Sequence, residues 1–309
     1  MMMPFRYNQQ MNSTHTISIL GGSGFVGTEL CTRLLQDNAN IKLLTRDISS
    51  CTHFTSIANV TIVCVQNYTT ETLVEALQGS DIVINLIGIL NETGHNGKQF
   101  YEVHTGITQN ALNACQQLGI KRYLQLSALN ANVDGPSHYL RSKGQAEQHL
   151  LTHCDDVAVS IFQPSVIFGE HDSFLNRFAS LLKFVPLVFP LACADAKFSP
   201  VYVGDVVAAM INSIDDPSSH SQIYPLCGPN TYTLKQLVEY TANISGRPCK
   251  VISLPATLSK IQAHIFEFIP GKPLSIDNYH SLQVDSVCTD GSTCTTPLEE
   301  IAPNYLGNH

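Results

Sequence analysis

The chain has 309 residues and a formal net charge of −8, because 17 lysines and arginines stand against 25 acidic residues. A hydrophobic fraction of 44% with 14% charged residues is enough for a buried core and argues against disorder. The negative balance disfavours nucleic acid as a partner and gives no long-range attraction toward anionic lipid. No run of residues is apolar and long enough to cross a bilayer, so the sequence predicts no transmembrane segment.

Ten cysteines are scattered singly between Cys31 and Cys294, with no C-x-x-C pair. In a chain of this length, the pattern predicts reduced thiols and a cytoplasmic location rather than a secreted fold held by disulfides. Residues 1–15 are polar, contain one basic residue (Arg6) and lack an apolar core, so they do not form a secretory signal. We expect residues 1–15 to be a disordered N-terminal extension.

From residue 16 onward, short β-branched or aliphatic runs alternate with amphipathic stretches. Strands are expected at 17–20, 41–45, 60–65, 82–87, 122–127 and 157–162. Helices are expected from the first glycines through residue 36, near 71–77, and across 101–118 and 139–153. This βαβ alternation with short connections predicts an α/β fold, with a Rossmann-type, doubly wound parallel sheet in residues 16–169.

After about residue 169 the pattern changes, because prolines become frequent and the expected strands shorten to 201–203 and 222–226. We expect residues 170–309 to form a smaller, mostly helical C-terminal region for the substrate. The chain is expected to interleave between the two regions, so this boundary is approximate.

An apolar stripe occurs in the second region, where Leu258, Ile261, Ile265 and Phe268 recur at helical spacing. The spacing predicts a helix that faces the core or forms a lid over the substrate pocket. The alternative is a helix that docks on a membrane surface or a partner. The lack of a basic polar face along the stripe counts against lipid binding.

A glycine-rich loop follows the first expected strand and opens the first helix. In the string ILGGSGFVG, three glycines form G-x-x-G-x-x-G. Such glycines allow a tight turn, close approach of the backbone to a pyrophosphate, and close packing of the helix. The free N–H groups and the positive end of the helix then bind the anion. The residues predicted to contact the nucleotide here are Gly21, Ser23, Gly24, Phe25, Val26 and Gly27.

The ends of the next strands indicate which dinucleotide binds. Arg46 ends the second strand in LLTRD, where an arginine accommodates a 2′-phosphate and an acid would bind the ribose 2′-hydroxyl. Arg46 therefore favours NADP(H) over NAD(H), although a solvated loop arginine paired with Asp47 is the alternative. Gln66 takes the adenine position after the third strand, where an amide can accept and donate. In NLIG, Leu86 and Gly88 are predicted cofactor contacts, and Gly88 would let the backbone pass close to the ribose.

A candidate catalytic set follows. Tyr139 and Lys143 form Y-x-x-x-K at the start of a helix and share one face, and Ser127 ends the preceding strand. A free tyrosine has a pKa of about 10, and lowering it by about 3 units needs roughly 4 kcal/mol of differential stabilisation. Lys143 and the positive cofactor ring could supply that, while Ser127 would hold the substrate oxygen. The alternative is a packed aromatic residue beside a surface lysine.

Five strings, GGSGFVG, NLIGIL, LQLSALNAN, YLRSK and PSVIFG, together resemble an extended or atypical short-chain dehydrogenase/reductase. The resemblance is closest to the branch with the NAD(P)H-binding accessory subunit of respiratory complex I and its bacterial relatives, and it covers nearly the whole chain. It implies a Rossmann fold, bound NADP(H), and the serine–tyrosine–lysine roles for Ser127, Tyr139 and Lys143. It also places Pro164 and Val166 against the nicotinamide.

The resemblance leaves two functions open. The first is a structural or assembly role beside respiratory or quinone-biosynthesis proteins, at the inner face of a respiratory membrane. The second is an NADP-dependent reductase or an NAD-dependent epimerase/dehydratase that uses the serine, tyrosine and lysine. A polar, roomy cavity beside Tyr139 would favour an enzyme, whereas an apolar one sealed by residues 181–189 would favour a scaffold or a lipid-like quinone substrate.

Two further patterns predict no site. His149 and His153 lie four residues apart beside Cys154, but no H-E-x-x-H motif or distant cysteine pair completes a zinc site, so no metal is predicted. No G-K-[ST] sequence occurs, which excludes a Walker-type loop.

Overall fold

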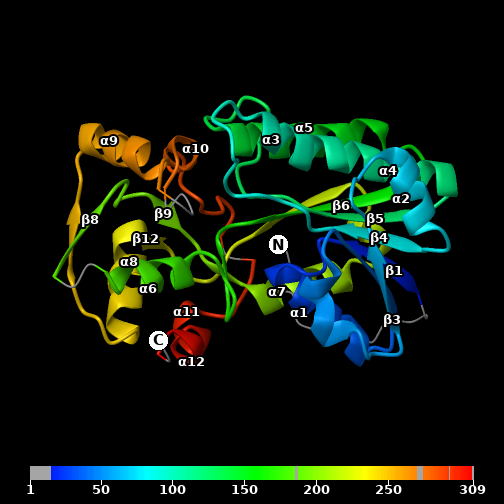
Figure 1. The fold of residues 1–309 in the computed structure, drawn as a ribbon, viewed down its shortest axis with the longest axis horizontal. Helices are drawn as coiled ribbons and strands as arrows, with labels where there is room; N and C mark the ends of the chain where they lie inside the picture. Colours follow the sequence, from blue (N-terminus) through cyan, green and yellow to red (C-terminus); the bar gives the residue numbers. More distant parts are fainter. Residues whose placement is uncertain (1–14, 185–186, 270–273, 292, 308–309) are drawn as a thin grey trace.

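The computed structural model describes residues 15–184, 187–269, 274–291 and 293–307. The expected N-terminal extension therefore lies outside the described residues except for His15, whose Nε2 is 2.9 Å from Asp215 Oδ1. Figure 1 shows a layered α/β part on the right and a smaller region, formed mostly by the later part of the chain, on the left.

A seven-stranded parallel sheet forms the centre of the larger part (Figure 1). Its order is β3-β2-β1-β4-β5-β6-β11, which confirms the predicted Rossmann-type, doubly wound sheet. The strands are β1 (Thr16–Leu20), β2 (Asn40–Thr45), β3 (Val60–Cys64), β4 (Ile82–Asn85), β5 (Arg122–Leu126), β6 (Ala158–Pro164) and β11 (Gln222–Leu226). The order reverses between β1 and β4, and ligands of such sheets bind outside the carboxyl ends of the strands at this point.

Helices cover both faces of the sheet (Figure 1). On one face lie α1 (Phe25–Gln36) and α7 (Val203–Asn212), and on the other α2 (Thr70–Leu77), α4 (Ile107–Leu118) and α5 (His138–His153). Each helix buries an apolar stripe, as α1 does with Leu30 and Leu34, so amphipathic spacing explains how it docks. The stretch 101–118, expected as one helix, follows α3 (Lys98–Phe100) and consists of a π-helical segment at Tyr101–Gly106 and then α4.

The chain returns to the main sheet after it has entered the C-terminal region, because β11 pairs with β6 at the sheet edge. The buried side chain of Arg122, at the start of β5, connects this part of the sheet. Its guanidinium donates to Ala158 O (2.9 Å), Ser160 Oγ (2.8 Å) and Ser219 Oγ (2.8 Å). One side chain therefore joins β5, β6 and the segment that leads into β11.

The C-terminal region has its own apolar core, to which Phe168, Leu175, Leu237 and Leu306 contribute. Its helices are α6 (Leu175–Leu182), α8 (Leu234–Ile244), α9 (Ala256–Phe266), α10 (Ile276–Ser281), α11 (Leu298–Ile301) and α12 (Pro303–Leu306). Three two-stranded sheets complete it: β7 (Ile167–Phe168) with β10 (Val201–Tyr202), β9 (Lys197–Phe198) with β12 (Tyr232–Thr233), and β8 (Val188–Leu191) with β13 (Lys250–Ser253). Within the described ranges, no helix has the length and apolar character needed to cross a membrane.

The apolar stripe on α9 does not face the core. Leu258, Ile261 and Ile265 are 47%, 52% and 59% exposed, and Phe268, just beyond the helix, is 79% exposed. The buried residues of this helix are instead the small Ser259 and Ala263. The expectation of a core helix is wrong, because helical spacing alone does not show which face of the helix is covered. The expectation of a lid stays a prediction, since His264 and Phe268 line a cavity beside α5.

Cys227 and Cys288 form a disulfide, separated by 61 residues of sequence. The expectation that all ten cysteines are reduced is therefore wrong for this pair. The link joins the end of β11 to the segment after α10, and only the tertiary fold brings these residues together. The other eight cysteines are free thiols.

Candidate functional site

The glycine-rich loop sits between β1 and α1 with the geometry that an anion requires. Gly21 has a φ of +80°, which favours glycine, and its carbonyl accepts a hydrogen bond from Gly24 N (3.1 Å). Gly24 is the N-cap of α1, and no side chain caps this helix end. The first N–H groups of α1, from Phe25 onward, therefore point toward the place where a phosphate would bind.

Two glycines of the loop have different reasons to lack a side chain. A Cβ at Gly27 would lie 2.5 Å from Gly21 O and 2.5 Å from Gly22 Cα, so the loop packs on α1 only if residue 27 is glycine. A Cβ at Gly24 would meet only Gly21 O, at 3.3 Å, and this residue is exposed. The chain's own packing therefore explains Gly27, whereas Gly24 leaves room for a pyrophosphate.

Other predicted contact residues lie at the start of α1. The Val26 side chain is buried in the apolar core between the sheet and its helices, so its backbone N–H is the group that it could offer to a ligand. Ser23 and Phe25 are half-buried at the start of α1.

Arg46 and Gln66 lie side by side at the ends of β2 and β3. Gln66 Nε2 donates to Arg46 O (3.1 Å), which holds the two strand ends together and leaves the Gln66 amide oxygen as an acceptor. Asp47 accepts from Ser49 N (2.9 Å) and Ser49 Oγ (2.7 Å). Among the described residues no Arg46–Asp47 ion pair occurs, so the alternative of a solvated loop arginine paired with Asp47 is not supported.

The segment after β4 brings the glycine-rich loop and the lysine to one place. A Cβ at Gly21 would lie 3.2 Å from the carbonyl carbon of Leu86. A Cβ at Gly88 would lie 3.3 Å from Lys143 Nζ and 3.6 Å from His104 Nε2. The glycine at position 88 therefore permits the close approach of the lysine side chain.

The ends of β5 and β6 lie at the same edge. Ser127 N donates to Phe162 O (2.7 Å), and Leu129 N donates to Pro164 O (2.9 Å), so the two segments stay paired at and beyond the strand ends. Val166 follows and packs against the core of the C-terminal region. The structure thus brings Ser127, Pro164 and Val166 to the carboxyl edge of the sheet.

Lys143 and Glu147 are buried on successive turns of α5. Burial lowers the pKa of Lys143 to about 8 and raises the pKa of Glu147 to about 6. Gln163 Nε2 donates to both oxygens of Glu147 (2.9 and 2.8 Å), and Lys143 Nζ donates to Leu126 O (3.1 Å). Glu147 is absent from the predicted site, although its spacing of four residues from Lys143 is a signal that could have identified it.

The Ser127 hydroxyl faces this buried carboxylate. It has no hydrogen bond of regular geometry within the described residues, yet it lies close enough to Glu147 to lower that residue's pKa. Ser127 is therefore oriented toward Glu147.

Tyr139 packs against two rings, Phe100 at a centroid distance of 6.1 Å and His104 at 5.4 Å. The sequence predicts that Lys143 lowers the pKa of this tyrosine. Within the chain itself the shift has the opposite sign, because burial and then the negative charge of Asp277 raise the pKa of Tyr139 to about 12. The expected lowering by Lys143 together with the cofactor ring therefore stays a prediction, and Asp277 is a charge that the sequence pattern did not include.

His104 supports the tyrosine helix as a neutral ring. Ile89 N donates to His104 Nε2 (3.0 Å), so Nδ1 carries the proton and donates to Ser142 Oγ (2.8 Å). The Ser142 hydroxyl donates in turn to Tyr139 O (2.9 Å). Burial and the charge of Lys143 lower the pKa of His104 to about 2, so the ring stays neutral at physiological pH.

A carboxylate from the C-terminal region completes the start of α5. Asp277 Oδ1 accepts from His138 N (2.6 Å) and Oδ2 accepts from Tyr139 N (3.1 Å), while Ser137 Oγ accepts from Leu140 N (3.1 Å). Acceptors at this position satisfy the unpaired N–H groups of a helix start. No local signal marks Asp277, because it is more than a hundred residues away in sequence.

A cavity of about 420 Å³ lies where the start of α5 faces α9 and α10. Its polar lining includes His95, His138, Arg141, His264, Asp277 and His280. Ser127, Tyr139 and Lys143 do not line it. Successive residues of a helix turn by about 100°, so positions 138 and 141 face a different side of α5 from positions 139 and 143.

His149 and His153 stack with a centroid distance of 4.4 Å. In the part of the chain that the structure describes, no group of three or more His, Cys, Asp or Glu side chains could hold a metal ion.

The sheet order and the glycine-rich loop between β1 and α1 define a Rossmann-type protein with the geometry of a dinucleotide site. Residues 21–170 match a family model described as NAD(P)H-binding. The chain is 30% identical over 306 residues to NADH dehydrogenase (ubiquinone) 1 alpha subcomplex subunit 9, mitochondrial, of Mus musculus, covering 94% of this chain and 80% of that protein. The Arabidopsis thaliana protein of the same name is 28% identical over 307 residues, covering 94% and 74%. The chain belongs to the family of this complex I subunit, which confirms the resemblance seen in the sequence.

Among solved structures, the chain is similar to the NADPH-dependent quinone oxidoreductase QOR2 of Escherichia coli, crystallised with NADPH. The TM-score is 0.74 at 19% identity, and the match covers 94% of this chain and 99% of that one. At this identity the likeness supports the fold alone.

Proposed function

We propose that this protein binds NADP(H) and retains it as a structural group, in a respiratory assembly or in quinone metabolism. It acts at the inner, cytoplasmic face of a respiratory membrane as a peripheral protein. The relatives named as complex I subunits support this role.

The observation that carries the proposal is the direction of the cavity beside α5. The cavity opens on the side of His138 and Arg141, while Tyr139 and Lys143 face another side of the helix. Tyr139 is half-buried beside Phe100 and His104, and in the chain itself its raised pKa opposes proton transfer at neutral pH. These features suit a dinucleotide that is held rather than turned over.

The preference for NADP(H) rests on Arg46. It follows β2, where the adenosine ribose of a Rossmann dinucleotide lies. The carboxylate of the neighbouring Asp47 accepts hydrogen bonds from Ser49 N and Ser49 Oγ, not from Arg46. A guanidinium can bind a 2′-phosphate with two parallel hydrogen bonds.

A catalytic reductase or epimerase/dehydratase is the second candidate. The polar lining of the cavity next to the start of α5 favours it, since carbonyl or sugar substrates need such groups. The dinucleotide would supply or accept a hydride. Ser127 would hold the substrate oxygen, and Tyr139 would move a proton with Lys143 beside it.

The first experiment denatures the purified protein and identifies any nucleotide that it releases. We expect NADP(H), close to one per chain, that survives gel filtration and is not oxidised by candidate quinones or carbonyl compounds. A protein that is purified empty, and that exchanges NADPH rapidly during turnover of a defined substrate, would overturn the structural role. Unchanged respiratory assembly and quinone content after gene deletion would count against it as well.

The variant Arg46→Asp tests the cofactor preference. It should weaken NADPH far more than NADH, because it replaces the partner of the phosphate with a like charge. Lys121→Asp is the matched control, since Lys121 is exposed and immediately precedes β5, at the amino edge of the sheet. Equal weakening of both nucleotides by Arg46→Asp would show that Arg46 does not bind the 2′-phosphate.

The variant Tyr139→Phe tests the second candidate once a substrate is known. Loss of turnover with unchanged NADPH affinity is expected for an enzyme, because the hydroxyl would then move the proton. Full activity of Tyr139→Phe would exclude that mechanism.

A further inference from the structure

An apolar face covers one end of the C-terminal region. Most of the large apolar side chains that are exposed in the described residues fall in two segments, 184–191 and 252–269. Phe184 and Leu187 are 83% and 78% exposed, more than Ile261 or Ile265 on α9. We name this surface the end face and define it by Phe184, Leu187, Val188, Ile252, Leu258, Ile261 and Ile265.

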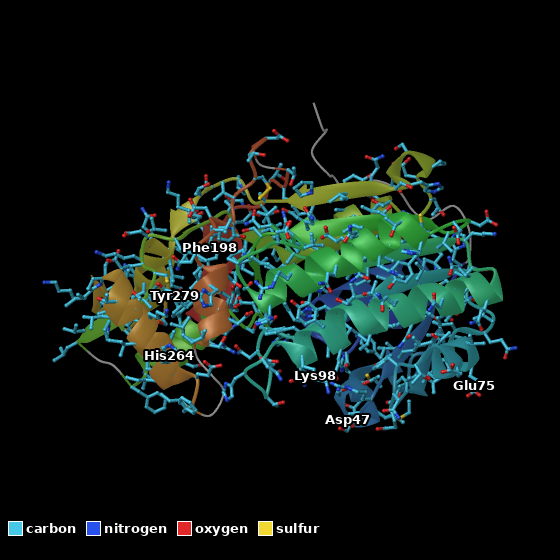
Figure 2. The ribbon with its side chains drawn as sticks, turned by 90° about the horizontal axis from the view of Figure 1, so that it is seen from above. Asp47, Glu75, Lys98, Phe198, His264 and Tyr279 are labelled. Atoms are coloured by element: carbon cyan, nitrogen blue, oxygen red, sulfur yellow. A yellow bond between two sulfur atoms is a disulfide. The ribbon has the colours of Figure 1, made fainter. Side chains whose placement is uncertain are left out.

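Hydrogen bonds join the segments that form the end face. β8 and β13 are paired, and Lys250 N donates to Leu187 O (3.0 Å). α9 is fixed to the end of β8, because Gln262 Nε2 donates to Pro190 O (2.9 Å). Figure 1 shows α9, β8 and their connections along the outer edge of the C-terminal region, and Figure 2 shows His264 of α9 at the opposite end of the long axis from Glu75.

The segments that form the end face carry more lysines than carboxylates, unlike the whole chain, and Glu239 on the neighbouring α8 lies 3.9 Å from Lys235 Nζ. Three exposed lysines flank the apolar side chains: Lys183 next to Phe184, Lys250, and Lys260 on α9. The only carboxylate in residues 183–184, 187–191 and 250–269 is Glu267, whose side chain is 13% exposed and lies 2.9 Å from His95 Nδ1. An excess of positive charge therefore borders an apolar surface on a chain of net charge −8.

We propose that the end face binds the surface of an anionic phospholipid bilayer. Its apolar side chains would enter the boundary between headgroups and acyl chains, and the lysines would contact phosphate groups. The sequence arguments against lipid rested on the net charge of the whole chain and on the α9 stripe, whereas the fold places Lys183 and Lys250 beside that stripe from neighbouring segments. A second copy of the chain fits less well, because it would bring two sets of lysines together.

This inference deepens one part of the proposed function, the peripheral membrane location, and does not rest on retention of the nucleotide. Long lysine side chains can follow an apolar surface and keep their ammonium groups at the level of lipid phosphates. The exposed phenyl ring of Phe184 and the leucine at 187 supply apolar groups at the other end of the same surface.

The test is flotation of the full chain with vesicles of phosphatidylcholine alone or with about 30 mol% phosphatidylglycerol, an anionic content that gives a negative surface potential. We expect binding to the anionic vesicles and a steep loss of binding as salt is added. The double variant Ile261→Gln with Ile265→Gln should weaken binding at least about tenfold, and Lys250→Gln or Lys260→Gln about fivefold each.

Matched controls use apolar residues that are exposed elsewhere. Leu151→Gln on α5 and Ile48→Gln, at positions 39% and 48% exposed, should leave vesicle binding unchanged. Circular dichroism and NADPH affinity of every variant should equal those of the wild type, because none of these residues lies in the core. A failure of vesicle binding with intact nucleotide retention is thus distinguishable from a failure of the proposed function.

Three results would overturn the proposal. The first is no flotation with anionic vesicles, and the second is flotation that Ile261→Gln with Ile265→Gln does not weaken. The third is a dimer, detected by light scattering, that this double variant dissociates while vesicles bind nothing. That result would assign the end face to a second copy of the chain.

Discussion

Replacing Gly27 by alanine tests the phosphate loop most directly. The new Cβ would lie 2.5 Å from Gly21 O, 2.5 Å from Gly22 Cα and 2.6 Å from Gly22 C, whereas ordinary contacts of a Cβ start at 3.4 Å. All three atoms belong to the backbone, so no rotation of a side chain relieves the overlap. The loop or the start of α1 must therefore move by about 1 Å.

The size of the effect follows from two separate costs. Overpacking costs about 1–3 kcal/mol, which at roughly 2 °C per kcal/mol lowers Tm by about 2–6 °C in a chain of this size. A hydrogen bond to a charged group contributes about 1.5–3 kcal/mol, so the loss of one N–H to the pyrophosphate weakens NADPH about tenfold to a hundredfold. Calorimetry measures the first quantity, and quenching of NADPH fluorescence measures the second.

Two other glycines serve as controls for Gly27→Ala. A Cβ at Gly106 would meet only Tyr101 O, at 3.7 Å, in helical backbone, so Gly106→Ala should leave both Tm and affinity near the wild-type values. Gly24→Ala should keep Tm and lose affinity. Wild-type Tm and affinity in Gly27→Ala would refute the packing argument, while a lower Tm with unchanged affinity would refute the role of the loop in binding phosphate.

Three further outcomes are expected. Because the folded pKa of Glu147 is about 6 against an ordinary 4.5, its protonation stabilises the fold below pH 4.5, and about 2 kcal/mol is lost as the pH rises through 6. Urea unfolding of Glu147→Gln should lack this decline, and an identical pH profile would contradict it. Asp277→Ala should lower the free energy of unfolding by about 1–2 kcal/mol, because the N–H groups of His138 and Tyr139 lose their acceptor. It should also lower the pKa of Tyr139, which tyrosinate absorbance measures with Tyr139→Phe as the blank. An unchanged pKa would exclude the effect of the Asp277 charge. Thiol labelling in denaturant should modify eight cysteines before reduction and ten after it, and ten labels before reduction would contradict the disulfide. Loss of the Cys227–Cys288 link should lower the free energy of unfolding by about 4 kcal/mol.

The elements with strong local patterns were predictable from the sequence. The strand β4 is predictable from its apolar run, because a strand buried on both faces needs apolar side chains throughout. The loop before α1 is predictable from its glycines, because a tight turn there requires them. The Tyr139–Lys143 spacing likewise predicts a shared helix face, and the structure buries Lys143 within reach of Gly88.

Features that depend on which surfaces meet were not predictable in this way. The Asp277 cap on α5 and the Cys227–Cys288 link join residues far apart in the chain, and no local pattern selects either partner. The raised pKa of Tyr139 in the chain itself follows from its surroundings in the fold, which include the distant Asp277, whereas the sequence shows only its spacing from Lys143. The exposed face of α9 is a further case, since a stripe that is apolar by spacing can cover a core or face outward.

The path of the chain through the sheet limits how this protein can be divided. A fragment that ends at residue 169 would lack β11, leave β6 as an open edge, and deprive Arg122 of Ser219. In the remaining fragment, β11 would lack its partner β6 and β10 would lack its partner β7. We therefore expect the two regions to unfold together. A chimera that exchanges the C-terminal region with that of another Rossmann protein needs chain junctions both before and after β11, so that β11 stays with the main sheet.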